Sequence, residues 1–357
     1  MNKKLLALAV TSALAGVSAG VNADTANVNV YGKLYLQAET VSGKGATAGP
    51  ASDLVSHQEI ADPNSYLGFK GEDNLGGGMK GWFQVETQLK VDTGTGIWAT
   101  RNSAVGLSGG FGNVFLGNWD TVYKQLGDPV SFLGISSGNF VSTSNVLSKR
   151  YDAAANTSFH LRQPNNLEYD TPTIAGFTVM LNYSPDEAKT FTTNKNLRDI
   201  GVKFEAGPLY VALAQEQHRD FTGAGNKDTA TRLSAKFTLP TGTTLGADLA
   251  NLEYKTATTG KFKTLSLVAT QALGNITLAG GVVKATKFSV DGNDVADSAG
   301  SQVNLGVSYS FSKRTQVYAI YSKLSNDAAA RFNNTISNTP AVGVDPEQFG
   351  VGVAVSF

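Results

Sequence analysis

Catalysis would have to begin from nucleophilic, basic or metal-binding side chains, and this sequence offers few arrangements of that kind. Its three histidines are His57, His160 and His218, and none of them stands in the spacing of a nucleophile elbow or a metal site. The run HRD at 218–220 matches part of a kinase catalytic loop, but the glycine-rich phosphate loop and the DFG run that a kinase also needs are missing. We therefore expect no enzyme activity and no cofactor or metal.

The composition removes further classes of protein. Cysteine is absent from the 357 residues, so neither a disulfide framework nor a thiolate metal site can form. The 29 basic residues balance the 29 acidic ones, which gives no reason to expect a nucleic-acid partner. A soluble exported protein and a membrane protein that crosses with strands are both compatible with this composition.

Residues 1–23 are typical of a secretory signal peptide. Two lysines precede an apolar run from Leu5 to about Val17, and small residues follow up to Ala23. The run is shorter than the ~20 residues that a membrane-spanning helix requires. We expect cleavage after Ala23, which leaves 24–357 as a single domain. Two of the 29 basic residues lie in the signal, so 27 then face 29 acidic ones.

Strict alternation of apolar and polar residues is the main structural signal. It runs through VNVYGKLYLQA at 28–38, MKGWFQVETQLKV at 79–91, SQVNLGVSYSF at 301–311 and QFGVGVAVSF at 348–357. In each run one face is apolar while the other is polar or small, which is typical of a strand between two different environments. Helical spacing is not sustained anywhere after the signal, so we expect an all-β domain.

The connections between the predicted strands alternate in length. Eight long polar segments and seven tight turns make fifteen connections, hence about sixteen strands. An antiparallel meander with its long loops at one end is typical of an up-and-down barrel. The long segments lie near 41–63, 92–97, 120–150, 185–197, 219–229, 256–261, 289–300 and 325–346, and the turns near 72–78, 109–113, 171–176, 206–208, 240–244, 272–275 and 312–315.

The polar faces favour a membrane barrel over a β-sandwich. They carry Lys, Glu, Gln and Asn at a density that suits water, and sixteen strands close into a cylinder too wide for side chains to fill. The apolar faces must then point outward into lipid. An open sheet edge in hydrocarbon would leave unpaired backbone groups at several kcal/mol each, so the last strand must pair with the first. We expect a transmembrane antiparallel barrel around an aqueous lumen.

The chain resembles the Gram-negative general porin family over essentially all of its mature length. The most specific stretches are VNVYGKLYL at 28–36, SYLGFKGEDNLGGGMKGWFQVE at 65–86, RNSAVGLSGGFGNVFLGN at 101–118, SKRTQVYAIY at 312–321 and the terminal Phe357. The resemblance implies a homotrimer in the cell outer membrane, exported through the periplasm, with long extracellular loops and contacts to lipid and lipopolysaccharide. It also implies that the third long loop folds into the barrel and narrows the pore.

The same resemblance implies a role for the last strand. In the family, a C-terminal aromatic residue with hydrophobic residues at alternate preceding positions is the signal read by the outer-membrane assembly machinery. Here those positions are Phe357, Val355 and Val353. The alternation also gives Phe357 a place at the membrane interface, where aromatic residues form a girdle.

The resemblance places a constriction where basic wall residues face acids on the inward loop. Lys33 in YGKLY, Arg101 in RNSAVGL and Arg162 in LRQPNN match the basic positions, while Tyr66 and Asn118 stand where relatives often have arginine. Alternation alone puts Lys33 on the polar face, which also fits an ordinary solvated charge. Arg101 shares the parity of apolar neighbours, so its place in the lumen comes from the resemblance.

The inward loop, about 120–150, is thin in acids. It has no charged residue from Pro129 to Ser148, and Asp120 and Asp128 are the nearest acidic candidates for the constriction. The local balance is therefore positive although the mature chain is slightly acidic. Charges beyond a Debye length of ~8 Å are screened at physiological salt, so the local balance decides.

These observations predict a passive, water-filled diffusion channel for ions and small hydrophilic solutes, with a modest preference for anions. A substrate-specific channel remains an alternative, because the uncharged loop, rich in Ser, Asn, Gly and Phe, also suits neutral or aromatic-bearing solutes. A barrel whose long loops act as an adhesin or receptor is a further alternative, since such use leaves no motif in one sequence.

Overall fold

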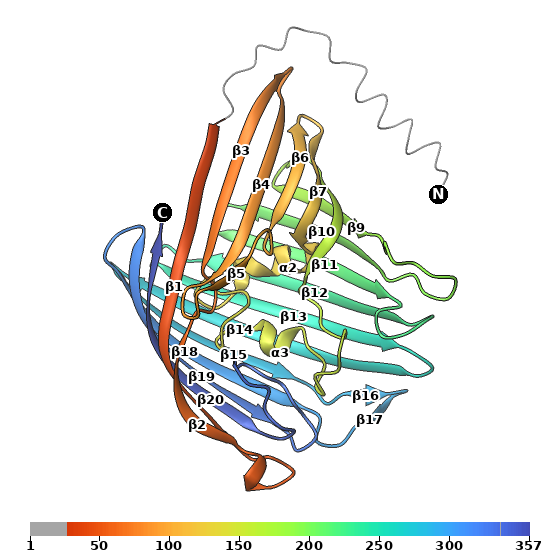
Figure 1. The fold of residues 1–357 in the computed structure, drawn as a ribbon, viewed down its shortest axis with the longest axis vertical. Helices are drawn as coiled ribbons and strands as arrows, with labels where there is room; N and C mark the ends of the chain where they lie inside the picture. The colour runs from red at the N-terminus through yellow and green to blue at the C-terminus, as the bar shows by residue number, and fades with distance from the viewer. Residues whose placement is uncertain (1–26, 336) are drawn as a thin grey trace.

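The computed structural model describes residues 27–335 and 337–357 of the chain (Figure 1). The predicted signal peptide, 1–23, lies outside the described residues. The strands are β1 (Asn27–Lys44), β2 (Leu54–Ala61), β3 (Tyr66–Gly76), β4 (Met79–Lys90), β5 (Thr95–Ile97), β6 (Ser103–Gly109), β7 (Gly112–Asp120), β8 (Arg162–Asp170), β9 (Phe177–Ser184), β10 (Asn196–Ala206), β11 (Leu209–Arg219), β12 (Lys227–Thr238), β13 (Thr243–Lys255), β14 (Thr259–Leu273), β15 (Ile276–Ala285), β16 (Ser289–Val290), β17 (Asn293–Asp294), β18 (Gly300–Ser310), β19 (Thr315–Asn326) and β20 (Asp345–Ser356).

The strands close into one antiparallel barrel. Each strand pairs with its neighbours along the chain, and β20 pairs with β1 from Lys33↔Ser356 to Lys44↔Asp345, so the first and last strands lie side by side (Figure 1). Two short elements share one barrel position, because β2 and β3 both pair with β1. Likewise β5 and β6 both pair with β4. The small hairpin of β16 and β17 belongs to a long loop. The predicted sixteen-strand barrel is confirmed.

Several loop boundaries differ from the sequence prediction, and the loop near 92–97 is one of them, because β5 lies within it and β6 begins only at Ser103. The segment 41–63 was predicted as one long loop, but β1 continues to Lys44 and β2 occupies Leu54–Ala61. Polar residues stand on both faces of these strand ends, so the alternation stops although the ladder of hydrogen bonds continues. The third long loop is also longer than predicted, since β8 begins only at Arg162.

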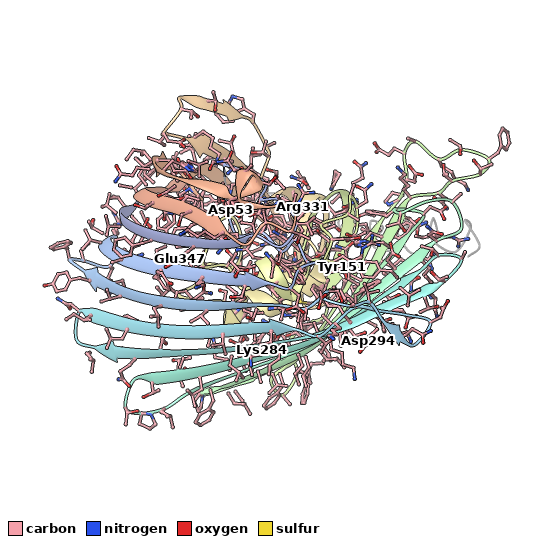
Figure 2. The ribbon with its side chains drawn as sticks, turned by 90° about the horizontal axis from the view of Figure 1, so that it is seen from below. Asp53, Tyr151, Lys284, Asp294, Arg331 and Glu347 are labelled. Carbon is pink, nitrogen blue, oxygen red and sulfur yellow. The ribbon has the colours of Figure 1, made fainter. Side chains whose placement is uncertain are left out.

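Large apolar side chains cover the outer face of the barrel. Leu34, Val105 and Leu116 are examples, and the last two are 68% and 63% exposed. An apolar surface of this extent suits lipid rather than water. The side chains of the strands project to both faces of the sheet (Figure 2). No helix in the described part of the chain is long and apolar enough to cross a membrane.

The third long loop, 121–161, folds into the bore and carries most of the helical structure. It contains α2 (Val122–Gly127), the 3-10 turn η2 (Asp128–Val130) and α3 (Ser144–Leu147), and Figure 1 shows α2 and α3 inside the ring of strands. A further 3-10 turn, η1 (Pro50–Ser52), lies in the first loop. Buried aromatic side chains such as Phe132 and Phe140 pack between the third loop and the inner wall.

Candidate functional site

Hydrogen bonds from wall side chains hold the third loop against much of the inner wall. Tyr210 on β11 and Tyr254 on β13 each donate a hydroxyl to a loop carbonyl at 2.7 Å. On β18, Gln302 Nε2 donates to Phe140 O at 2.7 Å and Asn304 Nδ2 to Val141 O at 2.8 Å. These contacts bind the loop to the β11–β18 side of the barrel. Asn139 Nδ2 of the loop also donates to Gln37 Oε1 on β1 at 3.0 Å, so the loop crosses the bore and narrows it beside the wall of β1, β3, β4 and β6.

A buried arginine fixes the start of the loop. Arg232 on β12 is 2% exposed, and its Nε donates to Asp248 Oδ1 at 2.8 Å while Nη2 reaches Gly127 O at 3.3 Å. Its third nitrogen, Nη1, lies 3.2 Å from Nδ1 of His160 near the end of the loop. One guanidinium thus joins the wall to both ends of the loop, and its charge is compensated by Asp248.

His160 is held neutral inside the loop. Its Nε2 lies 3.2 Å from the carbonyl of Ser136, so the neutral ring donates there and accepts from Arg232 at Nδ1. Burial, together with the positive charges of Lys124 and Arg232, holds the pKa of His160 well below its usual range. The unfolded chain takes up a proton near pH 6.5, whereas the folded protein does not. Folding stability is therefore lost as the pH falls below about 6.5.

We expect His160→Gln to remove part of this acid sensitivity. A glutamine amide can still donate to Ser136 O and accept from Arg232, but it cannot take up a proton. The wild type should lose about 1.4 kcal/mol more than the variant between pH 7.5 and pH 5.5. Urea unfolding of both proteins in lipid vesicles at the two pH values measures this difference. Equal losses in the two proteins would show that His160 does not titrate on unfolding.

The wall opposite the loop carries a stacked arginine that sequence alternation had not placed. Arg101 precedes β6, so strand parity does not apply to it, and its guanidinium lies 4.7 Å from the ring centre of Tyr66. Its Nε forms an ion pair with Glu86 on β4, and its Nη1 donates to Asn64 Oδ1 at 2.6 Å. Asn118 donates to the carbonyl of Arg101 at 3.0 Å and so helps to fix its backbone.

A second charged cluster joins the wall to the loop. Arg162 Nη2 lies 3.0 Å from Asp120 Oδ1, and Asn102 bonds to both residues. Lys124 Nζ on α2 lies 2.9 Å from Asp120 Oδ2 and 3.2 Å from Asp128 Oδ2. Burial raises the pKa of Asp128, and the adjacent Lys124 opposes that shift. Each acid of this cluster therefore has at least one basic partner.

Lys33 differs from the other basic residues of this region. It lies on β1 directly opposite Tyr66 on β3, and its Nζ is 4.6 Å from the ring centre of Tyr35. Within residues 27–335 and 337–357, no carboxylate forms an ion pair with it. Among the described residues, its ammonium group therefore contacts an aromatic ring and no carboxylate.

Two charged residues of this region were not among the sequence candidates. Glu86 lies on the polar face of β4, which alternation could identify, but its contact with Arg101 depends on how residues before β6 fold back. Lys124 stands four residues after Asp120 and four before Asp128, a helical spacing in a loop that was not predicted to form a helix. The six charged residues of the two clusters form, together with Lys33, a set of seven that we call the lumen charge group. Its members are Lys33, Arg101, Lys124, Arg162, Glu86, Asp120 and Asp128.

The predicted assembly residues lie on the outer face of the last strand. Val353 and Val355 on β20 and the terminal Phe357 are all exposed. Phe357 continues the pairing with β1, because its N–H donates to Gly32 O at 3.0 Å and its carbonyl accepts from Gly32 N at 3.1 Å. The terminus therefore lies inside the closing ladder of the barrel.

A closed barrel with an apolar exterior, a charged lumen and a loop folded into its bore has the architecture of a membrane channel. The chain belongs to the Gram-negative porin family, whose sequence profile matches residues 7–329. It is thus an outer-membrane porin, and its barrel forms a diffusion channel.

Individual proteins show the same relationship. The "Major outer membrane protein P.IB" of Neisseria lactamica is 27% identical over 356 residues, covering 96% of this chain and 99% of that protein. The "Outer membrane porin protein 32" of Delftia acidovorans is 29% identical over an alignment that covers 100% of this chain and 99% of that protein.

Solved structures share the fold. The anion-selective porin from Comamonas acidovorans superposes with a TM-score of 0.75 at 23% identity, covering 93% of this chain and 100% of that one. OmpT of Vibrio cholerae in its trimer form gives 0.68 at 18% identity, covering 94% and 100%. At these identities the likeness concerns the fold alone.

Proposed function

We propose that this porin conducts ions and small hydrophilic solutes with a modest preference for anions. The observation that carries the proposal is the unpaired charge of Lys33 within the lumen charge group. Four basic members of that group face three acidic ones, and every acidic member has a basic partner. The group therefore carries one positive charge in excess, although the mature chain is slightly acidic as a whole.

The expected size of the anion preference depends on the effective dielectric constant inside the pore, which is higher when more water fills it. Two unit charges ~4 Å apart interact by about 4 kcal/mol at an effective dielectric of 20 and by about 1 kcal/mol in water. A wide aqueous pore lies toward the smaller value, so a few-fold preference is expected. Tyr66 supplies no charge at a position where relatives often carry arginine, which reduces the preference further.

Planar bilayers with a KCl gradient test this proposal. The reversal potential of the wild type should have the sign of a chloride-selective pore, and it should decrease as the salt concentration rises. A potassium-selective reversal potential would contradict the proposal.

We also infer that the lumen charge group together with Tyr66 forms the constriction. We infer in addition that the protein assembles as a homotrimer in contact with outer-membrane lipid, lipopolysaccharide and the assembly machinery. The constriction is supported by the approach of the loop, because a Cβ on Gly138 would lie 2.8 Å from Pro63 O beside this wall. The trimer is supported by the similar fold of a Vibrio cholerae outer membrane protein described in trimer form. The mass of the detergent-solubilised protein tests the trimer.

We infer further that the protein is not an enzyme. His218 is buried and bonded to Glu216 at 2.6 Å, and His160 is bonded to Arg232 and the loop backbone. His57 lies 3.7 Å from Glu59. All three histidines thus have contacts that a structural role explains.

A further inference from the structure

The inner wall formed by β1 and β3 carries three cation–aromatic pairs in a small area. Lys33 lies over Tyr35 at 4.6 Å and Lys70 over Tyr31 at 5.1 Å. Arg101 lies over Tyr66 at 4.7 Å. Each such pair places a positive charge against the electron-rich face of a ring. The surface therefore combines fixed positive charge with flat aromatic area.

Glycines on neighbouring strands hold aromatic rings flat against this wall. A Cβ added to Gly68 would lie 2.3 Å from the ring of Tyr31, and on the adjoining strands β4 and β6 one added to Gly106 would lie 2.5 Å from the ring of Trp82. The rings therefore occupy the places of the missing side chains. Hydrogen bonds fix their polar ends, because Tyr31 donates to Glu86 at 3.2 Å and Trp82 Nε1 to Asn113 Oδ1 at 2.8 Å.

Tyr66 stands at the centre of this surface. Its ring meets Tyr31 edge-on at 6.2 Å, and it lies between Lys33, its direct partner on β1, and the guanidinium of Arg101. The charge of Arg101 is compensated by Glu86, whereas that of Lys33 is not. A solute at Tyr66 therefore meets a phenol ring with a guanidinium over it, beside an ammonium group that has no carboxylate partner among the described residues.

The loop that faces this wall does not repel a negatively charged solute. Gly138 approaches the residues before β3, because a Cβ added to it would lie 2.8 Å from Pro63 O, and the partly exposed Ser136 and Ser137 precede it. None of these residues carries a charge or a bulky polar group. The narrow part of the bore thus has its charged and aromatic side on β1 and β3 and a small, uncharged side on the loop.

We propose that this wall is a binding track for small anions that carry an aromatic ring, and that the channel passes them in preference to aliphatic anions of the same size and charge. The carboxylate of such a solute pairs with Lys33, and its ring stacks on the Tyr66–Arg101 surface. An aliphatic carboxylate gains only the contact with Lys33. The proposal rests on the anion preference proposed above and adds a second selection, by ring stacking.

Benzoate and cyclohexanecarboxylate are suitable probes, because they differ mainly in the aromaticity of the ring. Reversal potentials with potassium benzoate on one side of the bilayer and potassium cyclohexanecarboxylate on the other give their permeability ratio. We expect the wild type to favour benzoate about threefold, which corresponds to about 0.7 kcal/mol at 1.4 kcal/mol per factor of ten. If the wild type has a benzoate-to-cyclohexanecarboxylate permeability ratio of one, that measurement alone overturns the proposal.

Variants locate the selection on the wall. Tyr66→Leu should lower the ratio to about one, and Tyr66→Phe should keep the wild-type ratio because the ring remains. Tyr183→Leu is the matched control, since Tyr183 lies on the outer face, where Arg198 stands 5.7 Å from its ring. A ratio that survives Tyr66→Leu would overturn the proposal.

The two measurements separate this proposal from the one on which it rests. A chloride preference in KCl with a benzoate ratio of one means that the charges select but the rings do not. A benzoate ratio of three without a chloride preference means that stacking operates although the net field does not favour anions. In the first case only the aromatic track is wrong, and in the second only the anion preference.

Discussion

Replacing Phe357 with aspartate is expected to lower the amount of folded barrel in the membrane by about tenfold, while synthesis of the chain continues. Phe357 pairs with Gly32 through two backbone hydrogen bonds, and a Cβ on Gly32 would lie 2.6 Å from its ring, so the ring covers the first strand where the barrel closes. A charged side chain there loses this contact and loosens the closing pair, and unpaired backbone groups in lipid cost several kcal/mol each. A tenfold loss corresponds to about 1.4 kcal/mol.

Heat-modifiable mobility on gels of membrane fractions measures the folded amount. Phe311→Asp is the matched control, because Phe311 is 65% exposed at the turn before β19 and does not end the chain. Phe357→Tyr should assemble like the wild type, since the ring is retained. Wild-type levels of folded Phe357→Asp would show that the terminal residue has no special part in assembly.

The barrel could be predicted because its determinant is local. Strict alternation marks which residues face lipid, and the structure places Val353 and Leu305 on the outer face as that alternation requires. Alternation of apolar and polar residues does not identify strands in the parts of the chain that do not face lipid. The alternation does not identify β2, because each of its faces mixes apolar and polar residues and the strand depends on pairing with β1.

The constriction candidates could be placed only in part, because a loop follows long-range contacts rather than a local pattern. The third loop is held by pairs such as Asn139 with Gln37 and Phe140 with Gln302, which are more than 100 residues apart in sequence. Lys33 needs only strand parity, and it was placed correctly on the inner face. Arg101 needs the path of the chain before β6, so its partner Glu86 was not foreseen.

Removing the positive charge of Lys33 and Arg101 together is expected to turn the pore from anion to cation preference. The lumen charge group then changes from four basic and three acidic members to two and three, and Glu86 loses its basic partner. About 1 kcal/mol of changed interaction in a wet pore corresponds to about a fivefold change in the chloride-to-potassium permeability ratio. Reversal potentials of the Lys33→Ala, Arg101→Ala double variant in a KCl gradient measure this ratio.

Two controls identify the source of the change. Lys284→Ala removes one positive charge from the exposed outer side of β15, where Figure 2 labels the residue, and it should leave the reversal potential unchanged. Arg101→Ala combined with Glu86→Ala removes a compensated pair, so the anion preference should persist because Lys33 remains. The effect of the Lys33, Arg101 double variant should also shrink in 1 M salt, where the Debye length is about 3 Å. If that double variant keeps the wild-type potential at low salt, the field that selects ions must originate elsewhere in the lumen, since these two side chains carry half of the group's positive charge.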